Sequence, residues 1–118
     1  MFKKYSLLLL FILLLTSFDS TAQTQAEMNQ IANNDFKKAD AELNKLYKQV
    51  MKILNENEKK LMIIAQKDWL KFRDSHCKFE IVQYDGGSIQ PLLYSTCLTE
   101  QTNKRIEDLK AILEDEAR

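Results

Sequence analysis

Apolar residues recur at alternating spacings of four and three over a stretch that begins near residue 32. A helix carries such positions on one face, because 3.6 residues complete each turn. The positions are Ala32, Phe36, Ala39, Leu43, Leu46, Val50 and Ile53. The pattern predicts one amphipathic helix across them. Thr24-Gln25-Ala26-Glu27 has the form of a capping box, which predicts that this helix begins at Thr24.

The polar segment 55–58 interrupts this pattern and predicts the start of a second helix, with Asn55 or Asn57 as its N-cap. The inner side of the second helix is expected to carry Leu61, Ala65, Trp69, Phe72 and Phe79.

A third helix is expected after the two glycines of the chain, Gly86 and Gly87. Ser88 is the predicted cap, and Pro91 is tolerated in the first helical turn because its missing N–H has no partner there. The inward stripe is expected to carry Leu92, Ile106, Leu109 and Leu113. Because no run of alternating residues resembles a strand, we predict an all-α fold of three long antiparallel helices.

The glycines are expected to reverse the chain between the second and third helices. Cys77 lies nine residues before Gly86, and Cys97 lies ten after Gly87. Equal rise along two antiparallel helices would bring the two cysteines side by side. We therefore predict a Cys77–Cys97 disulfide that staples this hairpin and stabilises the fold by about 3 kcal/mol.

The first residues resemble a secretory signal peptide. Lys3 and Lys4 precede an apolar run from Leu7 to Leu15, and the small residues before and at Ala22 suit a signal peptidase. The run is shorter than the ~20 residues that a membrane-spanning helix needs, and no cysteine near it could carry a lipid. We predict a signal peptide over residues 1–22 and a single periplasmic or secreted domain over residues 23–118, with no stable membrane span.

Charge and composition exclude several kinds of function. Removing the predicted signal peptide changes the formal net charge from 0 to −1, which argues against nucleic-acid binding. The chain has one histidine, His76, no glycine-rich phosphate loop and no cluster with metal-ligand spacing. We therefore expect no catalytic residues, no metal and no cofactor, and an enzymatic function ranks last.

Reversal near residues 55–58 predicts which residues of the first two helices face each other. Residues whose numbers sum to about 113 should meet, and several of these are polar. We expect them to form a semi-buried polar seam that fixes the register of the helices, in preference to an active site. The seam residues are Asp40, Asn44, Tyr47, Gln66, Trp69 and Arg73.

The turn between the cysteines is the candidate partner-binding element, because rigid loops on a scaffold commonly carry binding residues. The alternative is a turn that does nothing but reverse the chain. The candidate residues are Tyr84, Asp85, Gly86, Gly87, Ser88 and Ile89.

Several segments, in order along the chain, resemble the LprI-like lysozyme inhibitor family. They include Ala39-Asp40, Ala65-Gln66 and Gly86-Gly87-Ser88, together with Asn44, Trp69, Arg73, Cys77, Cys97 and Arg105. The resemblance implies an all-helical exported domain and inhibition of host lysozyme. Many relatives have a cysteine where this chain has Ile31, and another upstream, so the resemblance also implies that one disulfide is absent here.

The sequence therefore suggests two alternative functions. The first is an exported protein-binding domain that inhibits lysozyme, with the backbone N–H groups of Gly86 and Gly87 or the Ser88 hydroxyl meeting carboxylates in the lysozyme cleft. The second is a structural or adaptor domain of the cell envelope. Exposed apolar residues such as Ile63, Ile81 and Val82 would favour the adaptor, whereas an ordered, protruding turn over residues 84–89 would favour the inhibitor.

Overall fold

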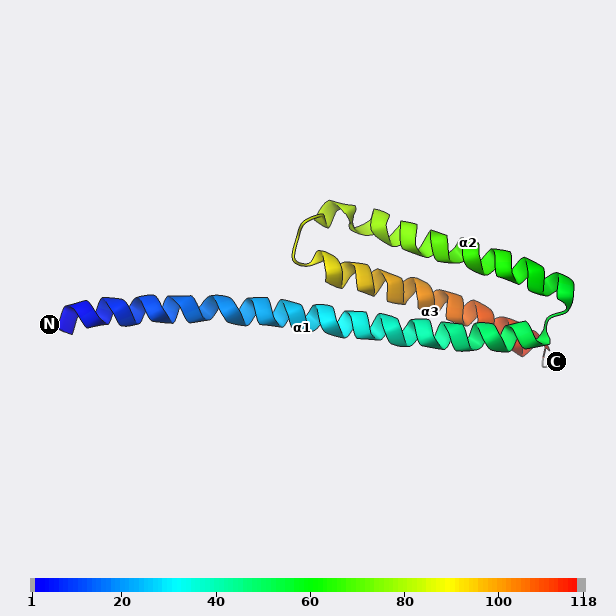
Figure 1. Ribbon diagram of the computed structural model, residues 1–118, viewed down its shortest axis with the longest axis horizontal. Helices are drawn as coiled ribbons and strands as arrows, with labels where there is room; N and C mark the ends of the chain where they lie inside the picture. The colour runs from blue at the N-terminus through cyan, green and yellow to red at the C-terminus, as the bar shows by residue number, and fades with distance from the viewer. Residues whose placement is uncertain (1, 117–118) are drawn as a thin grey trace.

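The computed structural model describes the backbone of residues 2–116 and the side chains of residues 24–115, so the predicted signal peptide lies outside the described side chains. The described residues form three α-helices and one short 3-10 helix, without a strand. These are α1 (Phe2–Ile53), α2 (Glu56–Ile81), η1 (Val82–Tyr84) and α3 (Gln90–Glu116). Each helix runs antiparallel to the one before it (Figure 1). The predicted all-α fold is confirmed.

Helix α3 lies between α1 and α2, and the first half of α1 extends beyond the other two helices (Figure 1). The main core lies between α1 and α3, where Leu43, Leu46 and Val50 pack against Ile106 and Leu109. These residues confirm much of the inward stripe predicted for the first and third helices. Among the described residues, no helix contains a stretch that is both long and apolar enough to cross a membrane.

The predicted inner side of α2 is wrong. Leu61, Phe72 and Phe79 are exposed, and Ala65 is exposed with them, while Trp69 alone of the predicted set is half-buried. The buried face of α2 instead carries Gln66, Arg73, Cys77 and Ile81.

The disulfide explains this rotation of α2. Cys77 must point at α3 to bond Cys97, and the two Cα atoms lie 5.7 Å apart. Phe79 and Phe72 are two and five residues from Cys77, and at 100° per residue both fall on nearly the opposite side of the helix. The predicted disulfide is thus confirmed, and its presence excludes the inner face that hydrophobicity alone suggests.

The ends of the helices agree with the sequence in part. Asn55 caps α2 in a capping box: its side-chain oxygen accepts from the Glu58 N–H at 3.0 Å, and the Glu58 carboxylate accepts from the Asn55 N–H at 2.8 Å. In the uncleaved chain no helix starts at Thr24, because α1 already begins at Phe2; the start at Thr24 stays a prediction for the chain after cleavage of the signal peptide. Upstream carbonyl groups are then available to bond the N–H groups that a cap would otherwise satisfy.

The start of α3 differs from the prediction by one residue. Helix α3 begins at Gln90, so Ile89 and not Ser88 holds the N-cap position. The Ile89 carbonyl accepts the first helical hydrogen bond, from Leu93 N–H at 3.1 Å. Pro91 lies in the first turn, as predicted.

Candidate functional site

The turn between α2 and α3 is held by its own hydrogen bonds. The Asp85 N–H donates to the Val82 carbonyl at 3.2 Å, the Gly87 N–H to the Tyr84 carbonyl at 2.9 Å, and the Gln90 N–H to the Gly87 carbonyl at 3.2 Å. The Gln90 side-chain amide also donates to the Asp85 carboxylate at 2.7 Å. The turn therefore has a defined shape, and the disulfide anchors both helices beside it.

Both glycines serve the shape of the turn. Gly86 has a φ of 76°, a conformation that residues with a Cβ rarely adopt. A Cβ on Gly87 would lie 3.0 Å from the Tyr84 carbonyl oxygen. The Gly87 N–H is already bonded to the Tyr84 carbonyl within the turn, whereas the contact of the Gly86 N–H or the Ser88 hydroxyl with a partner's carboxylate stays a prediction. The side chains of Tyr84, Ser88 and Ile89 are exposed.

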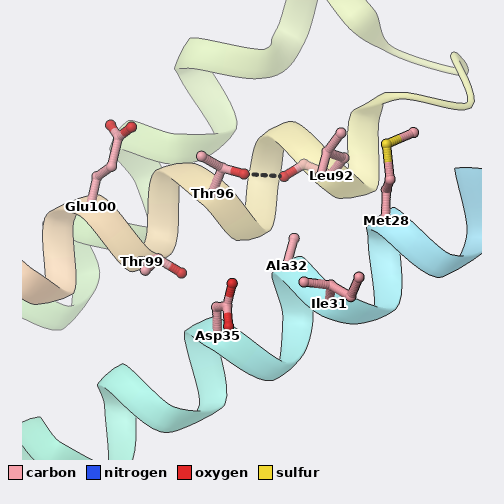
Figure 2. A pocket seen from close by; sticks show the side chains of 8 residues that line it. All are labelled: Met28, Ile31, Ala32, Asp35, Leu92, Thr96, Thr99 and Glu100. Carbon is pink, nitrogen blue, oxygen red and sulfur yellow. Dashed lines mark hydrogen bonds between the residues drawn. The ribbon is translucent and has the colours of Figure 1, made fainter.

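A groove lies between α1 and α3 beside this turn (Figure 2). Its volume is about 310 Å³. Helix α1 contributes Met28, Ile31, Ala32 and Asp35, and α3 contributes Leu92, Thr96, Thr99 and Glu100. Ile31 is exposed at this groove.

The polar groups of this groove differ in what they can offer a partner. The Thr96 hydroxyl donates to the Leu92 carbonyl at 2.8 Å (Figure 2), and the Thr99 hydroxyl donates to the Ser95 carbonyl at 2.9 Å. Both donors are occupied within α3. The charged groups of the groove are therefore the Asp35 and Glu100 carboxylates, set among apolar side chains.

A second groove lies on the other side of α3, between α3 and the end of α2. Its wall on α2 and η1 carries His76, Glu80, Ile81, Gln83 and Tyr84, and its wall on α3 carries Leu93, Thr96, Cys97, Glu100 and Gln101. Thr96 and Glu100 line both grooves, so these two residues form a ridge between them.

The two grooves share one electrostatic character. Asp35, Glu80 and Glu100 line them, and neither is lined by a lysine or an arginine. The imidazole Nε2 of His76 lies 3.9 Å from the Glu80 carboxylate, and the ring stacks on Phe72 with centroids 5.3 Å apart. Acidic groups beside apolar walls suit the cationic and apolar side chains of a protein partner.

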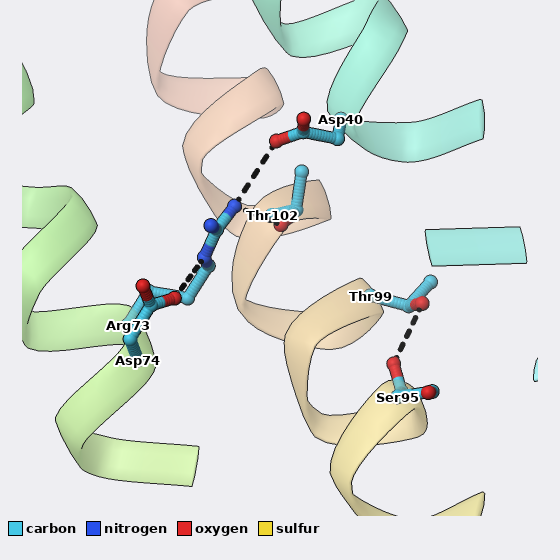
Figure 3. Close-up of polar contacts among 6 residues, drawn as sticks. All are labelled: Asp40, Arg73, Asp74, Ser95, Thr99 and Thr102. Carbon is cyan, nitrogen blue, oxygen red and sulfur yellow. Dashed lines mark hydrogen bonds and ion pairs between the residues drawn. The ribbon is translucent and has the colours of Figure 1, made fainter. Parts of the chain in front are cut away.

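Arg73 is the centre of the polar seam (Figure 3). Its Nη1 lies 3.2 Å from the Asp40 carboxylate of α1 and 3.3 Å from the Thr102 hydroxyl of α3, and its Nε lies 3.0 Å from Asp74. The guanidinium also lies over the rings of Phe36 and Trp69, at 5.1 and 5.3 Å from their centroids. Arg73 thus joins all three helices.

The other seam residues are distributed differently from the prediction. Gln66 is buried, and by the sum rule it was expected to face Tyr47. Its side-chain oxygen instead accepts a hydrogen bond from Arg105 Nε at 3.0 Å. Tyr47 and Trp69 pack against the core, while Asn44 is exposed. The structure therefore brings Asp40 and Arg73 together but does not extend one continuous polar row along α1 and α2.

Two members of the seam were not predicted, Thr102 and Arg105, and both belong to α3. Thr102 is fully buried and lies at helical spacing between the buried residues Leu98 and Ile106. That spacing could have predicted that Thr102 is buried. It could not have predicted that an arginine of another helix donates a hydrogen bond to the threonine hydroxyl. The contacts of Arg73 with Asp40 and Thr102, and of Gln66 with Arg105, join different helices.

The hydroxyl of Tyr94 has a perturbed acidity near this seam. Burial raises the pKa of Tyr94 above its ordinary value of 10.0, and the Asp74 carboxylate acts in the same direction, while the Arg73 guanidinium opposes both. The raised pKa makes deprotonation of this hydroxyl harder than in an exposed tyrosine. In the part of the chain that the structure describes, no three His, Cys, Asp or Glu side chains cluster closely enough to hold a metal ion.

Comparison with known proteins adds the family. Residues 18–109 match the family described as "Lysozyme inhibitor LprI". The chain is also 36% identical over 106 residues to an uncharacterized protein of Rhizobium meliloti (strain 1021), covering 79% of this chain and 76% of that protein. No solved structure matches the chain.

Proposed function

Because this chain belongs to the LprI lysozyme inhibitor family, we propose that it is an exported, non-enzymatic domain that binds and inhibits a lysozyme. Export rests on the predicted signal peptide and is compatible with the disulfide, which forms in oxidising compartments. Family membership is the observation that carries the proposal of inhibition, since a fold by itself confers no activity.

The proposed contact surface is the end of the domain that carries the turn and both grooves. The hydrogen-bonded turn presents Tyr84, Ser88 and Ile89 without a large loss of conformational entropy on binding. The carboxylates of Asp35 and Glu100 beside the turn suit cationic groups of the target.

A division of roles between the turn and the grooves avoids electrostatic conflict. A lysozyme cleft contains catalytic carboxylates, which would repel further carboxylates. In the proposal, the hydroxyl groups of Tyr84 and Ser88 enter the cleft as hydrogen-bond donors. The groove carboxylates bind basic side chains at its rim, and the Asp85 carboxylate stays engaged with Gln90.

The test is a lysozyme assay on cell-wall substrate with the purified, oxidised protein. We expect stoichiometric inhibition. Tyr84→Ala with Ile89→Ala should weaken it at least about tenfold, as expected when central interface residues are truncated. Asp35→Asn with Glu100→Gln should slow association in a salt-dependent manner.

The matched control removes two exposed carboxylates that line neither groove, by Asp68→Asn and Glu114→Gln. This control should inhibit as the parent does. Inhibition that survives both site variants would show that the contact surface lies elsewhere. Absence of inhibition by well-folded protein, with every lysozyme class tried, would refute the proposed function.

A specific observation favours the adaptor as the second candidate. Val82 and Ile63 are exposed apolar residues, although Ile81, which we expected to be exposed with them, is buried. Further apolar side chains are exposed along α2, on both sides of Ile63 in the sequence.

A further inference from the structure

Helix α2 exposes a row of large apolar side chains on the face turned away from α3. Leu61, Ile64, Phe72 and Phe79 are 55–73% exposed. Phe72 lies eleven residues after Leu61 and Phe79 seven after Phe72, spacings that keep all three within about 20° of one line along the helix. We call these four residues the outer stripe of α2.

A row of lysines runs beside the outer stripe. Lys60, Lys71 and Lys78 each directly precede a stripe residue, and Lys67 lies between them on the same side of the helix. All four are exposed, and none makes an ion pair with a described residue. This local excess of positive charge stands out in a chain whose formal net charge is 0.

The shape of this face argues against a protein occupant. The outer stripe lies along one side of a single helix, which is a convex surface, and the four grooves between helices are lined by neither stripe residues nor these lysines. Pairing with a second copy in antiparallel fashion is also disfavoured. In such pairs the same flank of each helix meets its equivalent, which would set the lysine rows against each other.

We propose that the outer stripe docks this domain on the surface of an anionic phospholipid bilayer. An exposed basic amphipathic helix lies in the interfacial plane, with its apolar face among the upper acyl chains and its cationic face at the headgroups. Phe72 and Phe79 would insert between the headgroups. The lysine side chains are long enough to keep their ammonium groups at the phosphates. A bilayer needs no complementary pocket.

An acidic residue within the stripe opposes this docking. Asp68 is exposed on the stripe side of α2, between Ile64 and Phe72, and its carboxylate would be repelled by anionic lipid. The proposal therefore predicts that Asp68→Asn strengthens binding about fivefold, the value of one elementary charge at such a surface.

Docking by α2 is independent of the proposed inhibition but compatible with it. Helix α3 separates α2 from α1 (Figure 1), so a domain lying on its α2 side would keep the groove between α1 and α3 away from the bilayer.

The experiment measures binding of the purified, exported protein to vesicles by flotation. Vesicles of phosphatidylcholine alone are compared with vesicles that contain phosphatidylglycerol as well. We expect binding to the anionic vesicles that weakens as salt is added. Glutamine at all four positions of the lysine row should weaken it several hundred-fold, at about fivefold per lysine.

A matched control carries the same change in net charge on α1, by glutamine at the exposed lysines Lys37, Lys45, Lys48 and Lys52. This control should bind as the parent does. Phe72→Ser with Phe79→Ser should also abolish binding while leaving the helical circular dichroism unchanged, since both rings are exposed. Any N-terminal segment is common to all variants, so their differences report on α2 alone.

Three outcomes would overturn the proposal. The first is equal binding to neutral and anionic vesicles. The second is equal loss in the α1 control and the α2 variant. The third is absence of vesicle binding together with a dimer, seen by light scattering, that Phe72→Ser dissociates. This last result would assign the outer stripe to contact between copies of the chain.

Discussion

Replacing Arg73 with alanine should destabilise the domain more than any change on its surface. The side chain is only 8% exposed. It reaches Asp40 of α1 at 3.2 Å and Thr102 of α3 at 3.3 Å, and it lies over the rings of Phe36 and Trp69. Truncation therefore removes contacts to both neighbouring helices at once and leaves the buried Thr102 hydroxyl without this donor.

The magnitude follows from these contacts. The ion pairs with Asp40 and Asp74 contribute about 0–1 kcal/mol each, because those carboxylates are 38% and 48% exposed and remain screened by water. The hydrogen bond to buried Thr102 adds about 1 kcal/mol, and each cation–π contact about 0.5–1 kcal/mol. The expected loss is about 2–5 kcal/mol, most of it from the buried contacts and not from the ion pairs.

Urea unfolding followed by far-UV circular dichroism measures this loss directly. The melting temperature should fall by about 8–40 °C. Lys71→Ala, which removes an exposed cation from the same helix, is the matched control and should change stability by less than about 0.5 kcal/mol. Arg73→Lys should recover little, because lysine lacks the planar fork that reaches two partners. Parental stability in Arg73→Lys would refute the reasoning, as would a loss below about 1 kcal/mol in Arg73→Ala.

Three further predictions concern stability. Asn55→Ala breaks the capping box with Glu58 and should cost about 1 kcal/mol in urea unfolding; an unchanged midpoint would contradict it. Replacing Cys77 and Cys97 with alanine should cost about 3 kcal/mol, and reducing agent should then have no further effect on the melting temperature. Because folding raises the pKa of Tyr94, its contribution to stability is complete at neutral pH and is lost as pH rises above the unfolded value of 10.0. As pH rises above 10.0, the free energy of unfolding should therefore fall less in Tyr94→Phe than in the parent. Equal falls in the two proteins would argue against a raised pKa of Tyr94.

Much of this protein is determined locally. The apolar spacing of three and four along residues 32–50 requires a helix with one buried face, whatever it packs against. Asn55 and Glu58 lie close enough in sequence to cap a helix without tertiary help, and the spacing of the cysteines about the glycines predicts their pairing. These features depend on residues a few positions apart or on the length of a hairpin, so sequence reasoning reaches them.

Only part of the candidate site could be predicted from the sequence. The turn over Tyr84–Ile89 could be located from its glycines, but the acidic grooves on either side of α3 could not. The groove between α1 and α3 is built from residues far apart in sequence, such as Asp35 and Glu100. Their proximity depends on how the helices pack, and no local pattern records it. The groove between α2 and α3 depends on how α2 is rotated about its own axis.

The rotation of α2 about its own axis is the clearest case in which tertiary structure decided the outcome. By itself, the sequence determined that residues 56–81 form a helix with aromatic residues on one side. The bond from Cys77 to Cys97 and the buried contacts of Arg73 turned the opposite side toward α3. A disulfide and a buried guanidinium must point at their partners, so they determine which side of a helix faces its neighbour. Hydrophobic burial favours one side but does not require it. Phe72 and Phe79 were therefore left at the surface.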